Sequence, residues 1–236
     1  MADIFTEVDE EVRRERLKVL WDRYSIFIIA AAVLIVAGIG GWRAYEYWTA
    51  QKAAVAGAAF EDAVTLSEQG KHAEAEKAFA KVVTEAPPGY AALARFREAA
   101  ELAQANPGKP ADAVKAYDAL AADAALGQTW QDLATLRAGL LLVDSAPFAD
   151  LKSRLEPIAA AGRPYRHTAR ELLALSAWHA NNVTEAKRYI DMLTGDGQTP
   201  PGARQRMDVL TALIAGEGKA NDGKPDAGKP NDGKKG

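Results

Sequence analysis

The residues that most often carry chemistry are few in this chain and form no familiar catalytic or metal-binding pattern. Its three histidines are His72, His167 and His179, and their separations match no spacing of metal ligands. The chain has no cysteine, which excludes disulfides, thiolate metal sites and cysteine nucleophiles. It also lacks a Gly-x-Ser-x-Gly elbow, a phosphate-binding glycine loop and a His-Glu-x-x-His motif. We therefore predict a non-enzymatic protein without a cofactor, a metal or a small-molecule substrate.

The acids that could act as general acids or bases recur at equivalent places in a repeated pattern. In each copy an acid precedes an alanine, and a bulky residue follows that alanine four positions later: Glu74-Ala75-Phe79, Asp112-Ala113-Tyr117 and Glu185-Ala186-Ile190. The small residue lets two helices approach closely, and the bulky residue fills the groove between neighbouring hairpins. The recurrence therefore places these acids at helix turns rather than in catalysis.

Apolar periodicity predicts helical hairpins around these motifs. A helix over 49–69 reaches the turn at Gly70-Lys71, and a second helix follows until Pro87-Pro88. Further turns are predicted at Gly108-Lys109 and Asn181-Asn182, with a degenerate hairpin between them that pairs 128–143 with 147–160, and a terminal helix over 203–215. The pattern resembles the tetratricopeptide repeat. We predict an all-α fold, an α-solenoid of about three to four hairpins plus a terminal helix over residues 49–215.

A transmembrane helix is predicted ahead of the repeats, over residues 25–48 with its aromatic flank. No charged residue lies between Arg23 and Arg43, and this run is just long enough to cross a bilayer as a helix. Tyr24 and Trp42 lie at its two ends, where aromatic rings favour the headgroup level. A cleaved signal peptide and a buried helix of a soluble protein stay open as alternatives.

The distribution of basic residues predicts the orientation of this helix. Five basic residues precede it and two follow it within a similar distance: Arg13, Arg14, Arg16, Lys18 and Arg23, then Arg43 and Lys52. Basic residues favour the cytoplasmic side. We therefore predict a bacterial inner-membrane protein with a cytoplasmic amphipathic segment (1–24), a periplasmic repeat domain (49–215) and a disordered tail (216–236). The net charge of −3 gives no basic surplus that would favour nucleic acid.

Hairpin repeats bind partners on the face that the first helix of each hairpin lines. The repeat register places Phe60 and Val64 near that face in the first hairpin, and Leu175 and Trp178 near it in the last, with His179 beside Trp178. We predict that these five residues bind a protein partner; for Trp178, core packing between hairpins is the open alternative.

Two glycines of the predicted membrane helix form a separate candidate site. Gly38 and Gly41 are spaced so that they share one helix face, and small residues at such spacing let another membrane helix approach closely. We predict that they pack against a partner helix in the membrane.

The whole arrangement resembles the family of ancillary SecYEG translocon subunits (YfgM-like) over about residues 5–215. The resemblance rests on the lead-in at 4–24 running directly into the anchor, and on the stretch Gly-Arg-Pro-Tyr-Arg-His-Thr-Ala-Arg-Glu-Leu-Leu-Ala-Leu at 162–175. It implies a non-enzymatic accessory protein beside the Sec channel that contacts a membrane-anchored periplasmic chaperone or prolyl isomerase. An envelope scaffold for cell division or cytochrome c maturation is the alternative that the residues leave open.

Overall fold

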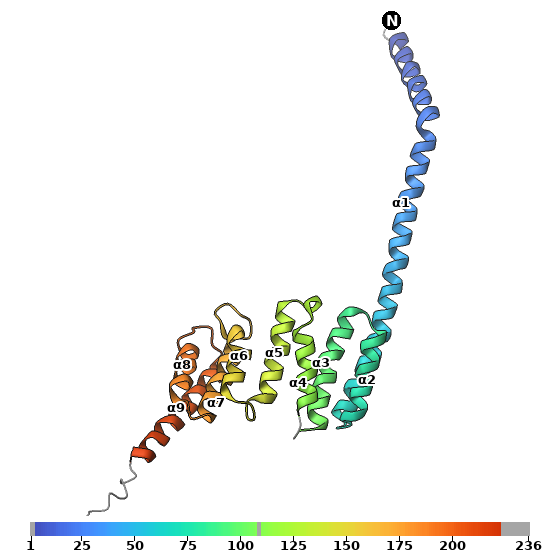
Figure 1. Ribbon diagram of the computed structural model, residues 1–236. Coiled ribbons are helices and arrows are strands. Elements are labelled where there is room, and N and C mark those ends of the chain that lie inside the picture. Colours follow the sequence, from blue (N-terminus) through green and yellow to red (C-terminus); the bar gives the residue numbers. More distant parts are fainter. Residues whose placement is uncertain (1–2, 108–109, 223–236) are drawn as a thin grey trace, which may run out of the picture. The chain divides into compact units, whose positions relative to one another are not determined.

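The computed structural model describes residues 3–107 and 110–222; the side chains of residues 3–17, 19–20 and 217–222 lie outside this description. The described residues contain nine α-helices, one short 3-10 helix and no strand (Figure 1). The helices are α1 (Asp3–Glu68), α2 (His72–Glu85), α3 (Pro88–Ala105), α4 (Ala111–Ala121), α5 (Gln128–Leu142), α6 (Phe148–Ala159), α7 (Arg166–His179), α8 (Val183–Thr194) and α9 (Pro201–Asp222). The all-α prediction is confirmed.

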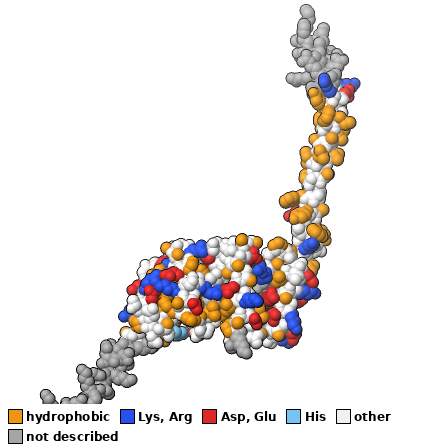
Figure 2. Space-filling model, in the orientation of Figure 1, with side chains coloured by type: hydrophobic (Ala, Val, Ile, Leu, Met, Phe, Trp, Pro, Cys, Tyr) orange, Lys and Arg blue, Asp and Glu red, His pale blue; other side chains and the backbone are white. Residues whose placement is uncertain are grey.

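The chain divides into two structural units, Met1–Gly57 and Ala58–Gly236. The first unit consists of most of helix α1. Its segment from Trp21 onward contains an 18-residue window of mean hydropathy 2.3, none of which is buried. Hydrophobic side chains cover this part of the helix (Figure 2). By length and composition, α1 is therefore a helix that is able to cross a membrane, and the predicted span at 25–42 lies within it.

The second unit is built from helical hairpins. The last turns of α1 pair with α2 through Phe60 and Phe79, whose ring centroids are 5.3 Å apart. Further pairs are α3 with α4, α5 with α6 and α7 with α8, and α9 packs on both α7 and α8. The helices follow one another in sequence order along this unit (Figure 1). Four hairpins and a terminal helix thus match the predicted solenoid, including the degenerate hairpin, which the structure forms from α5 and α6.

The repeated alanines and bulky residues of the sequence motif form the core of these hairpins. Phe79, Ala75 and the facing Ala63 are fully buried together in the first hairpin. The equivalent pairs of the second and fourth hairpins are also buried: Ala113 and Tyr117, then Ala186 and Ile190. Burying one large apolar side chain contributes about 1.5–3 kcal/mol, so these repeated contacts are the main source of stability.

Two of the hairpin turns share one backbone design. At the first turn Gly70 has a φ of +73°, and the amide of Lys71 donates to the carbonyl of Leu66 at 3.0 Å. At the last turn Asn181 has a φ of +57°, and the amide of Asn182 donates to the carbonyl of Ala177 at 2.8 Å. This left-handed residue closes the preceding helix, and glycine and asparagine are the residues that tolerate it best. The predicted turn at Gly108-Lys109 lies outside the described residues.

The terminal helix is longer than the sequence pattern indicates. We place its predicted end at Ala215, just after the last large apolar residue, Ile214, whereas α9 continues to Asp222. Ile214 is buried against the large core cluster, and the helical backbone continues for about two further turns beyond it. The remainder of the predicted tail, residues 223–236, lies outside the described residues.

The left-handed turn at Gly70 generates a first prediction. Gly70→Ala should destabilise the repeat unit by about 1–2 kcal/mol, because a Cβ disfavours this backbone conformation. Gly89→Ala is the matched control, since Gly89 lies in the first turn of α3 with open space around the added Cβ. Urea unfolding followed by circular dichroism measures both. Equal stability of the two variants would show that the turn is not strained by a side chain.

Candidate functional site

The first helices of the hairpins form one continuous layer. Ring contacts link α1 to α3 through Phe60 and Tyr90, at 6.1 Å between centroids, and α3 to α5 through Phe96 and Trp130, at 5.4 Å. Helix α5 in turn contacts α7, and α7 contacts α9. We call these five helices, α1 from residue 58 onward, α3, α5, α7 and α9, the first-helix layer.

The second helices form another layer, and ion pairs link its neighbours. Arg154 on α6 pairs with Asp118 on α4. Between α6 and α8, Lys152 lies 3.1 Å from Glu185 and Arg188 lies 2.8 Å from Glu156.

A buried tyrosine joins the same ion-pair network. The hydroxyl of Tyr189 donates to Glu156 at 3.3 Å, and burial raises the pKa of Tyr189 to about 12, so this hydroxyl stays a donor. The hydrogen bond from Arg188 holds the pKa of Glu156 below its usual range. The charges of this second-helix layer are therefore largely satisfied by one another.

Basic residues of the stretch 162–175 bind the loop between α8 and α9 through Asp196. We call this set of hydrogen bonds the clamp. Asp196, in the loop after α8, accepts hydrogen bonds from Arg166 at 2.8 Å, His167 at 3.0 Å and Arg170 at 3.2 Å. The hydrogen bond from Arg166, followed by that from the amide of Gln198, holds the pKa of Asp196 well below its usual range. The basic residues of this stretch thus hold the α8–α9 loop against the start of α7.

Each of the three histidines lies against a carboxylate from another segment rather than in a shared site. The nitrogen–oxygen distances are 2.7 Å for His72 and Glu101, 3.0 Å for His167 and Asp196, and 3.6 Å for His179 and Asp144. Glu101 is buried and also accepts a hydrogen bond from Ser67 at 2.6 Å. Among the described residues, no group of three or more acidic or histidine side chains is arranged to hold a metal.

The outward face of the first-helix layer carries exposed apolar side chains. Leu93 on α3 is 41% exposed, and Trp130 and Leu140 on α5 are 40% and 48% exposed. Val209 and Leu213 continue the series on α9, at 57% and 48%. Elsewhere on the visible surface of this unit, charges of both signs are interspersed with apolar groups (Figure 2). Exposed aromatic and aliphatic side chains along a helical layer are typical of a protein-binding surface.

The structure places the five predicted partner-binding residues in two separate groups. Phe60 and Val64 are half-buried and pack against the core of the first hairpin. Leu175 and Trp178 are half-buried against the large core cluster, and His179 is exposed at the end of α7. The apolar surface between the two groups, on α3 and α5, contains residues that the sequence analysis missed. Trp130 and Leu140 lie in the degenerate hairpin, where no repeat register indicated their direction.

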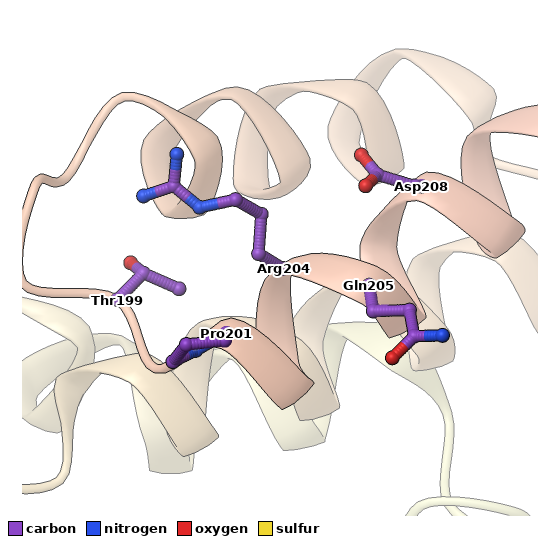
Figure 3. Close-up of a pocket in the computed structure, with 5 residues that line it drawn as sticks. All are labelled: Thr199, Pro201, Arg204, Gln205 and Asp208. Atoms are coloured by element: carbon purple, nitrogen blue, oxygen red, sulfur yellow. The ribbon is translucent and has the colours of Figure 1, made fainter.

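A hollow at the start of α9 is a weaker candidate. Five residues line it: Thr199, Pro201, Arg204, Gln205 and Asp208 (Figure 3). Two of its polar side chains are used by the fold, because Thr199 donates to the carbonyl of Leu193 at 2.6 Å and Arg204 donates to that of Asp196 at 3.2 Å. We assign no ligand to this hollow.

Stacked hairpins with an exposed first-helix layer define a helical-repeat protein of the kind that binds other proteins. A model for the tetratricopeptide repeat-like domain matches residues 18–172, more than half of the chain, and the chain belongs to this family. Such repeat domains are generally non-enzymatic scaffolds for protein–protein interaction. No curated protein and no solved structure gives a significant match.

The charge of Asp196 generates a prediction on acid stability. Its pKa is lowered in the folded state, so below about pH 4 the unfolded chain binds more protons than the folded one. The stabilisation is therefore present above that pH and is lost as the pH falls further. Asp196→Asn should lower the thermal midpoint at pH 7 and flatten the decrease in midpoint on acidification. Asp208→Asn, an exposed position on α9, is the control in the same thermal scans. Identical acid profiles for the two variants would contradict the role of the clamp.

Proposed function

We propose that this protein is a membrane-anchored adaptor that binds other proteins through the first-helix layer of its periplasmic tetratricopeptide-like domain. The anchor is the apolar part of α1, with the N-terminus in the cytoplasm of a bacterial cell. The basic residues that precede the span, as described from the sequence, support this orientation. Membership of the repeat family supports protein partners in general.

One observation carries this proposal more than any other: a single helix joins the membrane-compatible segment to the first repeat. Helix α1 has no break between residues 25–42 and Phe60, which packs inside the first hairpin. The family match begins at residue 18 and so includes the apolar segment as well as the repeats. The end of the same helix supplies part of the domain core, with Ala63 fully buried there.

We further propose that the partner complex is the SecYEG translocon, to which this protein would link a membrane-anchored periplasmic chaperone or prolyl isomerase. Support comes from the resemblance carried by the lead-in at 4–24 and by the stretch at 162–175. The second of these forms the clamp around Asp196, so its conspicuous basic residues serve the fold. The adaptor role therefore rests on the anchor and on the first-helix layer.

Gly38 and Gly41 are the proposed contact within the membrane. A Cβ added at either position meets no side chain outside its immediate neighbours within 4 Å. The helix face that Gly38 and Gly41 share is therefore open to another membrane helix, and such small residues let that helix come close. This contact would hold the anchor beside the channel.

Photo-crosslinking from the first-helix layer tests the protein-binding proposal. A photoreactive phenylalanine analogue at Trp130 or Trp178 should capture a protein partner in intact membranes. The same analogue at Lys115 or Lys187, exposed on the second helices α4 and α8, is the matched control and should capture far less. Mass spectrometry identifies the adducts. Equal capture from both layers, or none from the first, would overturn the assignment of the binding face.

Replacement of the anchor tests the translocon proposal. Residues 25–42 exchanged for an unrelated apolar helix should keep the protein in the membrane but abolish recovery of the Sec channel in mild detergent. Gly38→Ile with Gly41→Ile should reduce recovery in the same direction, and Ala30→Ile with Ala31→Ile is the control. Unchanged recovery would show that the membrane helix makes no specific contact. Capture of division or cytochrome-assembly proteins without the channel would establish the alternative envelope scaffold.

A further inference from the structure

Two arginines of the repeat unit differ from the other eight. Residues 58–222 contain ten arginines, and within the described structure eight of them donate a hydrogen bond to a carboxylate or a carbonyl. These eight are Arg95, Arg154, Arg163, Arg166, Arg170, Arg188, Arg204 and Arg206. Arg97 and Arg137 make no hydrogen bond or ion pair with the described residues, and both are exposed. Their donors are therefore available to a partner.

Both arginines lie on the outward face of the first-helix layer. Arg97 follows Leu93 by four residues on α3, and Arg137 lies between Trp130 and Leu140 on α5, at spacings that keep each set on one helix face. Each of these residues is exposed. Phe96 joins the two helices through its ring contact with Trp130. The two free guanidinium groups thus belong to the same surface as the exposed apolar residues.

The two positive charges also act on the same neighbour. Burial raises the pKa of Tyr117, and the charges of Arg137 and Arg97 oppose this rise from α5 and α3 respectively. The charges of Arg97 and Arg137 thus act on one phenol from two different helices.

Two of the nearby acids are engaged elsewhere. Glu101, four residues after Arg97, accepts from Ser67 and lies 2.7 Å from His72. Asp132 on α5 accepts from Arg163 at 2.7 Å and from Gln128 at 2.9 Å. Neither of these acids pairs with Arg97 or Arg137, although the charge of Glu101 also acts on Tyr117 and raises its pKa.

We propose that Leu93, Phe96, Arg97, Trp130, Arg137 and Leu140 form a docking patch for an acidic, apolar segment of a partner protein. Arg97 and Arg137 bind carboxylates of the segment, and an apolar side chain of the segment packs on Trp130. Arginine suits this role because its planar fork bonds a carboxylate through two donors. The aromatic and aliphatic neighbours exclude water around these bonds and supply the apolar contact. The patch deepens, and rests on, the proposed function of the first-helix layer.

A defined peptide pair tests this patch on the full-length protein in detergent micelles. The probe is a fluorescein-labelled, end-capped peptide in which glutamates flank a tryptophan and a leucine, and its counterpart carries glutamines instead. Fluorescence anisotropy should show a clear preference for the glutamate peptide that weakens as salt is added. Arg97→Gln and Arg137→Gln should each weaken its binding about ten-fold, as expected when a hydrogen bond to a charged group is lost.

Matched variants separate the patch from general charge. Lys115→Gln with Lys187→Gln removes the same charge from the second helices and should leave the affinity unchanged. Trp130→Ala should weaken both peptides, because it removes the apolar contact common to them. Equal binding of the two peptides to the unmodified protein, or an undiminished affinity of Arg97→Gln with Arg137→Gln, overturns the proposal. Light scattering measures the oligomeric state of the same double variant. If that state changes and the unmodified protein binds neither peptide, the patch binds a second copy of this chain, and the proposal is overturned.

The crosslinking described above distinguishes this failure from failure of the proposed function. If partner adducts at Trp130 persist in the double arginine variant, the first-helix layer still binds proteins. Only the proposed preference for acidic segments is then wrong. If the first-helix layer gives no adducts in membranes but the purified protein still prefers the glutamate peptide, the docking patch stands and the adaptor role is overturned.

Discussion

The close approach of paired helices at small side chains is the constraint on which the rest of this fold depends. In the first hairpin Ala75 and Ala63 give no side-chain bulk beyond a methyl group, and Phe79 fills the space beside them. The third hairpin reverses the arrangement, because the small residue is Gly139 on the first helix and the bulky one is Leu155 on the second. A Cβ added at Gly139 would lie only 2.8 Å from Leu155 Cδ2. Either arrangement brings two helices into contact over a narrow apolar strip, and only stacking of several hairpins buries that strip from both sides.

Apolar burial and exposed ion pairs contribute different amounts of free energy to the stability of the repeat unit. A buried side chain such as Phe79 contributes about 1.5–3 kcal/mol, and this contribution recurs in every hairpin. The ion pairs between the second helices are partly exposed, and such pairs contribute at most about 1 kcal/mol each. Apolar packing therefore holds the hairpins together, while pairs such as Arg188 with Glu156 align neighbouring second helices. In the first-helix layer, ring contacts join α1, α3 and α5, and the ion pair of Arg206 with Glu171 joins α9 to α7. Apolar and cationic side chains stay exposed on this layer.

The sequence predicts the periodic part of this structure well because packing imposes the period. The hairpin predicted over 128–143 and 147–160 corresponds to α5 and α6, although neither helix carries the repeated alanine motif. The prediction rested on spacing, because the 73 residues between Ala113 and Ala186 are about two repeats long and leave room for one more hairpin. The predicted binding residues followed the same register, and the register says nothing about a degenerate unit, so Trp130 was missed. Whether an arginine is paired depends on partners far away in sequence, as for Arg154 and Asp118, and periodicity carries no such information.

A membrane anchor changes the affinity that a surface of this kind requires. The α3–α5 patch offers two cations and a few apolar side chains, which by themselves support a modest affinity. If the anchor also contacts the partner complex through Gly38 and Gly41, the second contact becomes intramolecular, and its effective concentration replaces the bulk concentration of the partner. Two weak sites on one chain then bind together far more tightly than either alone, while each can still release a segment quickly. In the adaptor that we propose, occupancy would then depend on the anchor, and selectivity would depend on the charge of the docking patch.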